Sequence, residues 1–74
     1  MFEVNLSTQL RRLREHRNLT QAQVAEYLNI SRPTYTYYEI GRTEPRLQTL
    51  VMLSKLYGVS VDEILNPPQK RRKK

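Results

Sequence analysis

The side chains with the most chemistry to offer lie in one short stretch, SRPTYTYYEIGR, which runs from Ser31 to Arg42. Turned at about 100° per residue, as in an α-helix, this stretch places Arg32, Thr36 and Tyr37 on one side. An arginine can donate two hydrogen bonds to N7 and O6 of guanine, and threonine and tyrosine hydroxyls can bond to phosphates. The pattern therefore indicates a helix face that binds nucleic acid.

The backbone of this stretch must be settled first, because its centre, TYTYY, is rich in residues that favour a β-strand. Ser31 is a good N-cap, Pro33 falls in the first turn, where its missing N–H costs little, and Gly41 can end a helix. Tyr35 and Tyr38 fall on the side opposite the polar face, where a core would take them. No other segment reads as a partner strand, so we predict a helix.

Two helices are expected before this one. Three leucines that begin at Leu6 recur at spacings of four and three, and Asn18 suits the left-handed position that stops a helix. Thr20 and Gln23 then form a T-x-x-Q capping box that starts a second helix. Asn29 again tolerates a positive φ after it.

Two more helices are expected after it. Pro45 precedes a fourth helix that Gly58 caps, and Ser60 with Glu63 forms an S-x-x-E capping box for a short fifth. The inward face of the fourth helix is predicted to hold Leu47, Leu50, Leu53, Ser54 and Tyr57. The fold class is therefore all-α, a compact five-helix domain.

Length and composition limit the classes of protein. A chain of 74 residues forms one small domain, and without Cys it has no disulfide framework and no thiolate metal site. The first residues, MFEVNLSTQ, lack the features of a signal peptide, and no apolar run approaches a membrane span. We expect a cytoplasmic protein that makes no use of a membrane and has no room for a ligand-sensing domain, so that control comes from its concentration, dimerisation or another protein.

The net charge of +6 is concentrated at the C-terminus. Five of the 13 Lys and Arg residues are the last five residues, KRRKK, so the remainder carries 8 basic and 7 acidic side chains. We predict a domain over residues 1–66 and a basic, disordered tail over residues 67–74, because Pro67-Pro68 cannot continue a helix. The tail either keeps the protein soluble or adds DNA affinity that is salt-sensitive and independent of sequence.

The joined second and third helices form a helix-turn-helix, whose second helix enters the DNA major groove. The motifs L-T-Q, S-R-x-T-x-x-x-Y-E-x-G-R-x-x-P and L-x-x-L-x-x-x-Y-G-V-S-V-D-E-I-L together resemble the Cro/CI-type helix-turn-helix, or XRE, family of bacterial and phage regulators. The resemblance covers about Leu6 to Leu65. It implies a lambda-repressor-like fold and a sequence-specific regulator of double-stranded DNA, a repressor that binds an inverted-repeat operator as a homodimer.

The resemblance also implies roles for single residues. The base-reading positions are Arg32, Pro33, Thr36 and Tyr37. The phosphate-binding positions are Gln21, Ser31, Thr34 and Arg42, and Gln21 is also expected to brace the reading helix. A structural ion pair joins Arg14 to Glu39. Pro33 departs from the family pattern because it cannot hydrogen-bond a base and offers only shape or an apolar contact.

Apolar side chains off the inward stripe of the fourth helix, together with the fifth helix, suggest a second surface. The residues in question are Val51, Met52, Leu56, Ile64 and Leu65. They either fill a small core from the side or form a homodimer surface. They also motivate an alternative function, a protein-interaction module such as an antitoxin that binds a partner protein.

An enzyme is not expected, nor a cofactor or metal, since the chain has one His, no Cys, two Gly and no evident acid–base pair apart from Arg14 and Glu39.

Overall fold

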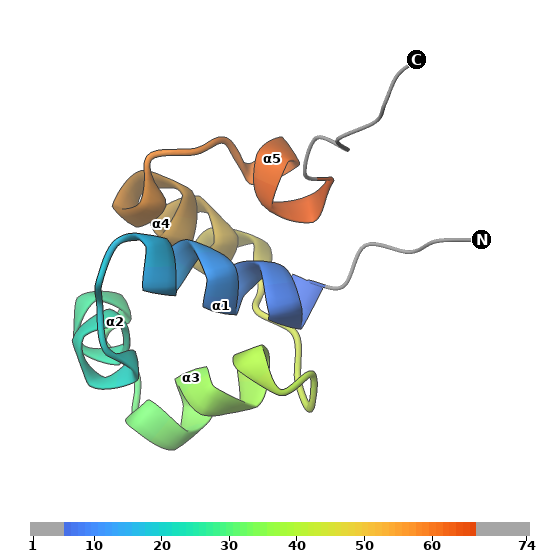
Figure 1. Ribbon diagram of the computed structural model, residues 1–74. Helices are drawn as coiled ribbons and strands as arrows, with labels where there is room; N and C mark the ends of the chain where they lie inside the picture. The colour runs from blue at the N-terminus through green and yellow to red at the C-terminus, as the bar shows by residue number, and fades with distance from the viewer. Residues whose placement is uncertain (1–5, 67–74) are drawn as a thin grey trace, which may run out of the picture.

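The structure, a computed structural model, describes residues 6–66 and contains five α-helices there. They are α1 (Leu6–His16), α2 (Gln21–Leu28), α3 (Arg32–Glu39), α4 (Leu47–Tyr57) and α5 (Val61–Leu65). Since the described residues hold no strand, the predicted all-α, five-helix fold is confirmed. In Figure 1, α1 crosses the middle of the molecule, with α2 and α3 below it and α4 and α5 above. None of these helices has the length and apolarity that crossing a membrane requires. The tail predicted over residues 67–74 lies outside the described residues.

Local caps start α2 and α3 and end α2 at the turn between them. The Thr20 hydroxyl accepts from the Gln23 backbone N–H at 3.0 Å, and the Gln23 side chain accepts from the Thr20 backbone N–H at 2.8 Å. Asn29, with φ at 61°, ends α2. The Ser31 hydroxyl then accepts from the Thr34 backbone N–H at 3.2 Å and starts α3. The TYTYY segment lies within α3, which starts at the Ser31 cap, so the prediction of a helix there is confirmed.

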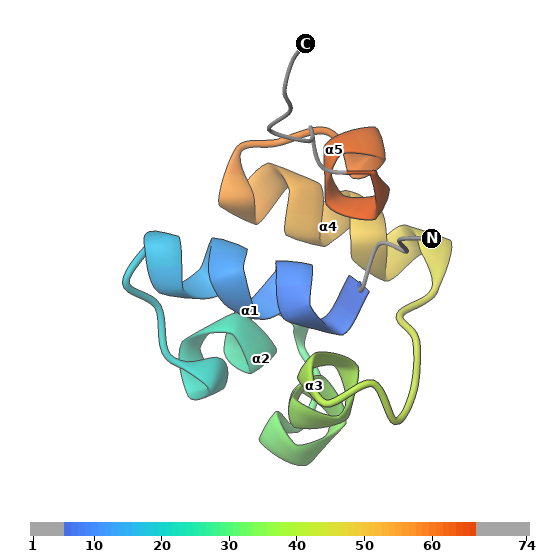
Figure 2. The ribbon, with the colours of Figure 1, turned by 45° about the vertical axis from the view of Figure 1, so that its right-hand side comes forward.

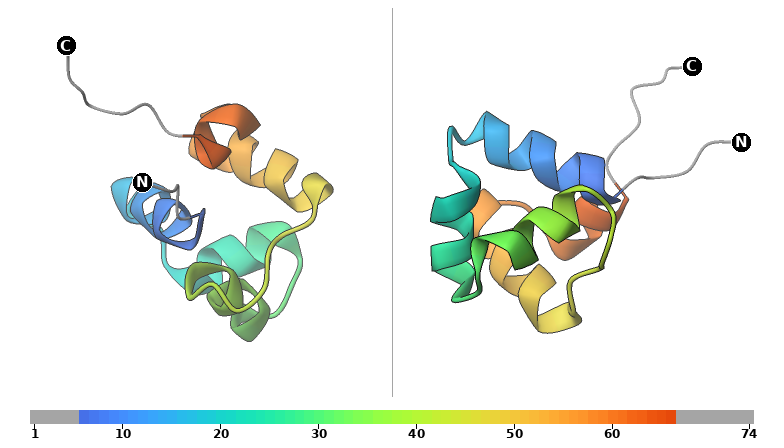
Figure 3. Two further views of the ribbon diagram at one scale, coloured as in Figure 1. Left: turned by 90° about the vertical axis from the view of Figure 1, so that its right-hand side faces the viewer. Right: turned by 90° about the horizontal axis from the view of Figure 1, so that it is seen from below.

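The fourth helix has the predicted ends, but its inward face begins later than predicted. Gly58 ends α4 with φ at 71°, and a Cβ at this position would lie 2.5 Å from Arg17 Nη2. Leu47 was expected on the inward face, but its side chain is 67% exposed. It is the first residue of α4, whose N-terminal end projects beyond the other helices in the left view of Figure 3. The inward stripe therefore starts one turn later, at the buried Leu50.

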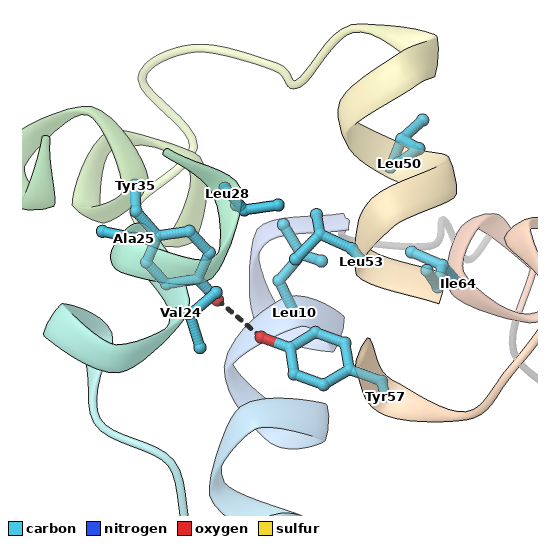
Figure 4. Packing of buried hydrophobic residues seen from close by; sticks show 9 residues of the cluster. All are labelled: Leu10, Val24, Ala25, Leu28, Tyr35, Leu50, Leu53, Tyr57 and Ile64. Atoms are coloured by element: carbon cyan, nitrogen blue, oxygen red, sulfur yellow. Dashed lines mark hydrogen bonds between the residues drawn. The ribbon is translucent and has the colours of Figure 1, made fainter. Parts of the chain in front are cut away.

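The core draws on all five helices. Its nine buried apolar residues are Leu10, Val24, Ala25, Leu28, Tyr35, Leu50, Leu53, Tyr57 and Ile64. Figure 4 shows the hydroxyls of Tyr35 from α3 and Tyr57 from α4 joined by a hydrogen bond of 3.0 Å. Tyr38 is half-buried and packs edge-on against Tyr35, with ring centroids 6.0 Å apart. The two tyrosines therefore face inward, as their position on the helix predicted.

The buried tyrosine pair makes stability sensitive to alkaline pH. Burial raises the pKa of Tyr57 to about 12 and raises the pKa of Tyr35 as well. Both hydroxyls stay neutral in the folded state at pH values where an unfolded chain would ionise them. We therefore expect the free energy of unfolding to be fully retained below pH 10 and to fall above it, by about 2 kcal/mol from Tyr57 alone once pH 12 is reached.

Urea unfolding between pH 7 and pH 11 measures this effect. The variant Tyr57→Phe should flatten the decline, although at pH 7 it costs about 1–3 kcal/mol because the Tyr35 hydroxyl loses its partner. Tyr27→Phe is the control, since this side chain is 43% exposed and should leave the slope unchanged. A wild type whose unfolding free energy stays level up to pH 11 would contradict the expectation.

Candidate nucleic-acid interface

One side of α3 faces away from the rest of the domain. Figure 2 shows α3 below α1 and α2, and the view from below in Figure 3 places it in front of the other helices. Its opposite side packs on α1 and α2 and buries Tyr35 and Glu39. The outer side is open to a partner, and Tyr37 on it remains 40% exposed.

A shallow groove of about 320 Å³ lies on this outer side. Its lining is Gln21, Arg32, Pro33, Thr36 and Tyr37. The structure thus brings together the four predicted base-reading residues with one predicted phosphate-binding residue. The groove presents a guanidinium group, a hydroxyl, an aromatic ring and an apolar proline ring, which is a mixture suited to the hydrogen-bonding edges and methyl groups of bases.

A buried ion pair holds α3 against α1. Arg14 donates from Nε to Glu39 Oε2 at 2.6 Å and from Nη2 to Glu39 Oε1 at 3.1 Å. The two side chains are only 13% and 3% exposed. Burial alone would raise the pKa of Glu39, but the interactions with Arg14, Tyr35 and Gln21 outweigh it and hold that pKa below its usual value. The carboxylate is therefore ionised at neutral pH and tied to its partner, which leaves it unsuited to proton transfer.

Gln21 connects this ion pair to the groove. Its amide nitrogen donates to Glu39 Oε1 at 3.0 Å, and its amide oxygen accepts from the Thr36 hydroxyl at 2.8 Å. The resemblance implied that Gln21 binds a phosphate and braces the reading helix, but the sequence did not identify Glu39 and Thr36 as its partners. Spacing along the chain could not reveal them, because Gln21 lies in α2 and both partners lie in α3.

The remaining predicted phosphate-binding residues lie at the two ends of α3. Ser31 and Thr34 occupy the N-terminal end, where their hydroxyls are 2.8 Å apart. Arg42 follows the C-terminal end, and its guanidinium carbon lies 5.3 Å from the centre of the Tyr37 ring. This cation–π contact, which the sequence analysis missed, braces the ring and contributes about 0.5–1 kcal/mol at an exposed site.

The predicted dimer surface is only partly exposed. Val51, Met52 and Leu65 are 38%, 37% and 38% exposed, and Leu56 is half-buried against the core. Ile64 is fully buried, so its assignment to a surface is wrong. The reason is that α5 is a single short turn whose inward side chain closes the core above α1 and α4. Ile40, which follows α3 and which the helical period places on the same side as Arg32, is 62% exposed.

Between residues 6 and 66, no three His, Cys, Asp or Glu side chains gather closely enough to hold a metal ion. Another hollow, of about 400 Å³, includes His16, Arg17 and Gly58 in its lining. Its arginine is already engaged, because Arg17 Nη2 donates to the Tyr57 carbonyl at 2.9 Å. This second hollow offers no arrangement of a nucleophile with a base.

The amino-acid sequence is similar to those of known transcriptional regulators. A family model described as helix-turn-helix matches residues 10–64. The HTH-type transcriptional regulator YqaE of Bacillus subtilis is 42% identical over 59 residues, which are 80% of this chain and 51% of the relative. The cryptic phage CTXphi transcriptional repressor RstR of Vibrio cholerae is 38% identical over 60 residues, 81% of this chain and 54% of the relative. The chain thus spans about half the length of these two relatives.

Solved structures agree with this assignment. The P22 c2 repressor protein, crystallised in complex with a synthetic operator, superimposes with a TM-score of 0.81 at 25% sequence identity. The superposition covers 88% of this chain and 98% of the repressor. The predicted helix-turn-helix is therefore confirmed as fold and as family. The chain belongs to the helix-turn-helix family of the Cro/CI, or XRE, type.

Proposed function

We propose that this protein is a sequence-specific, double-stranded DNA-binding transcriptional regulator that acts as a repressor in the cytoplasm. The observation that carries the proposal is the groove on the outer side of α3, where Arg32, Pro33, Thr36 and Tyr37 come together. The likeness to the P22 c2 repressor, which was crystallised with an operator, supports it. So does the similarity to RstR, which is named a transcriptional repressor.

In this proposal α3 enters the major groove, which is wide enough to admit a helix. Arg32 donates two hydrogen bonds to a guanine, while Pro33 and the Tyr37 ring contact thymine methyl groups. The phosphates on either side are bound by Gln21, Ser31, Thr34 and Arg42. The ion pair between Arg14 and Glu39 takes no part in the contact itself and holds α3 at a fixed angle to the domain.

The proposal includes a homodimer. Val51, Met52 and Leu65 are exposed apolar side chains on α4 and α5, away from α3, and they would pair around a two-fold axis. Such a dimer places two copies of α3 about 34 Å apart, one turn of DNA, on an inverted repeat.

Selection of bound duplexes from a random library, in moderate salt, tests the function. We expect an enriched inverted repeat with half-sites about 10 base pairs apart, bound by two chains per duplex. A reporter gene placed behind the selected site should fall in expression. Activation of the reporter would contradict the repressor assignment, and the absence of any enriched sequence would contradict the proposal as a whole.

Deletion of Lys70 to Lys74 separates this function from charge-driven binding. Loss of five cations should weaken binding to every duplex and reduce its salt dependence, while the selected repeat stays the same. If the tail alone binds DNA, the deletion abolishes binding and the domain shows no preference.

The exposed apolar side chains favour one second candidate, a protein-interaction module such as an antitoxin. Val51, Met52 and Leu65 would then cover a partner protein and not a second copy of the chain. A partner that co-purifies in stoichiometric amount, together with no measurable DNA affinity, would establish this function in place of the first.

A further inference from the structure

The hydrogen bonds around Gln21 have a fixed direction. An ionised carboxylate can only accept hydrogen bonds, so the Gln21 amide must turn its nitrogen toward Glu39 Oε1, 3.0 Å away. Its oxygen then points to Thr36, whose hydroxyl lies 2.8 Å away and must be the donor. The negative charge on Glu39 therefore sets the direction of both hydrogen bonds. The Gln21 amide cannot be reversed without placing its oxygen against a carboxylate oxygen of Glu39.

Thr36 is left with a restricted set of interactions. A hydroxyl has one hydrogen, and that hydrogen is given to Gln21 Oε1. What Thr36 can still offer to the groove is an oxygen lone pair and its Cγ2 methyl group. Thr36 and Gln21 line the same groove as Arg32 and Tyr37, so this restriction applies where a base edge would lie.

We propose that Glu39 and Gln21 are positioning residues that make Thr36 an acceptor-only reader, which selects an A·T base pair at the position it faces. This inference rests on the proposed DNA-binding function. In the major groove only adenine N6 and cytosine N4 donate hydrogen bonds, whereas guanine and thymine present acceptors. An A·T pair adds the thymine methyl as a contact for Cγ2, while a C·G pair adds two guanine acceptors.

The same arrangement leaves Gln21 able to bind DNA itself. A glutamine amide carries two N–H groups, and Glu39 occupies one of them. The second can donate to a phosphate at the N-terminal end of α2, so the phosphate-binding and positioning roles are compatible.

Nuclear magnetic resonance of the free protein tests the hydrogen bonds without DNA. We expect the side-chain amide protons of Gln21 to exchange with solvent at least about tenfold more slowly than those of the exposed Gln48, because one of them is donated to the buried carboxylate of Glu39. Thr36→Val, which removes the donor and keeps the shape, should shift the Gln21 amide signals. Gln21 amide protons that exchange like those of Gln48 would overturn the proposal.

Duplex selection with variants tests the consequence. The wild type should require A·T at one symmetric position, and Gln21→Met should lower the preference for adenine over guanine about tenfold, because the Thr36 hydroxyl becomes free to donate. Gln48→Met is the matched control and should keep the wild-type preference, and thermal unfolding checks that each variant is folded. A selective wild type whose preference survives Gln21→Met overturns this inference alone. A wild type that binds every duplex alike overturns the proposed function, and this inference with it.

Discussion

Replacing Arg32 by alanine is expected to erase the preference for one base pair in each half-site, by about 10- to 100-fold, while leaving the rest of the selected repeat intact. Arg32 is exposed in the first turn of α3 and lines the groove with Pro33, Thr36 and Tyr37. A bidentate contact between arginine and guanine contributes about 1–3 kcal/mol of discrimination against the wrong base. Duplex selection with wild type and variant in parallel, followed by affinity measurements on single-base variants of the site, gives the change directly.

The loss of one positive charge must be separated from the loss of base reading. Arg12→Ala is the control, because Arg12 is an exposed residue of α1 outside the groove. Arg12→Ala should at most weaken binding to all duplexes by the same factor, and the preference for one base pair should stay unchanged. If Arg32→Ala behaves in the same way as this control, Arg32 contacts a phosphate and the base-reading assignment fails.

Breaking the ion pair between Arg14 and Glu39 is expected to cost about 3–5 kcal/mol of stability, whichever partner is replaced by alanine. Each single variant leaves the remaining charged side chain buried and without its partner, since the Arg14 and Glu39 side chains are only 13% and 3% exposed. A domain of this size has a total stability of about 3–5 kcal/mol, so either variant should be largely unfolded at 25 °C. Circular dichroism and urea unfolding measure the loss.

Two further variants test whether burial of the charges causes this large loss of stability. Arg14→Met combined with Glu39→Leu removes both charges and should recover much of the loss, because no unpaired charge remains. Arg11→Ala breaks an ion pair of 3.1 Å whose side chains are 65% and 54% exposed, and should cost less than about 1 kcal/mol. Equal losses in Arg11→Ala and Arg14→Ala would show that burial has no influence here.

Acidification should reveal the same pair in the wild type. The pKa of Glu39 lies below its usual value in the folded state, so the pair stabilises the fold fully above about pH 4.5. That stability is lost as the pH falls through the lowered pKa and the folded carboxylate takes up a proton. Glu39→Gln should therefore show a smaller dependence of the unfolding free energy on pH below 4.5 than the wild type does.

The helices could be predicted because their boundaries depend on residues close together in the sequence. Thr20 and Gln23 start α2, Ser31 starts α3, and Gly58 ends α4, each through contacts within about one turn. The shared face of Arg32, Thr36 and Tyr37 was predictable for a related reason, since the 3.6-residue period decides which α3 side chains lie on one side. The ion pair between Arg14 and Glu39 could be predicted only from the family motifs, because the two residues are 25 positions apart and no local rule pairs them.

Sequence patterns alone were enough to predict the five helices, the helix-turn-helix and the outward side of α3. The contacts between helices were needed to show that Ile64 is buried, that Leu47 is exposed, and that Gln21 donates to Glu39 and accepts from Thr36. Periodicity and caps act along one helix, whereas burial and the direction of a hydrogen bond depend on atoms that neighbouring helices bring into contact.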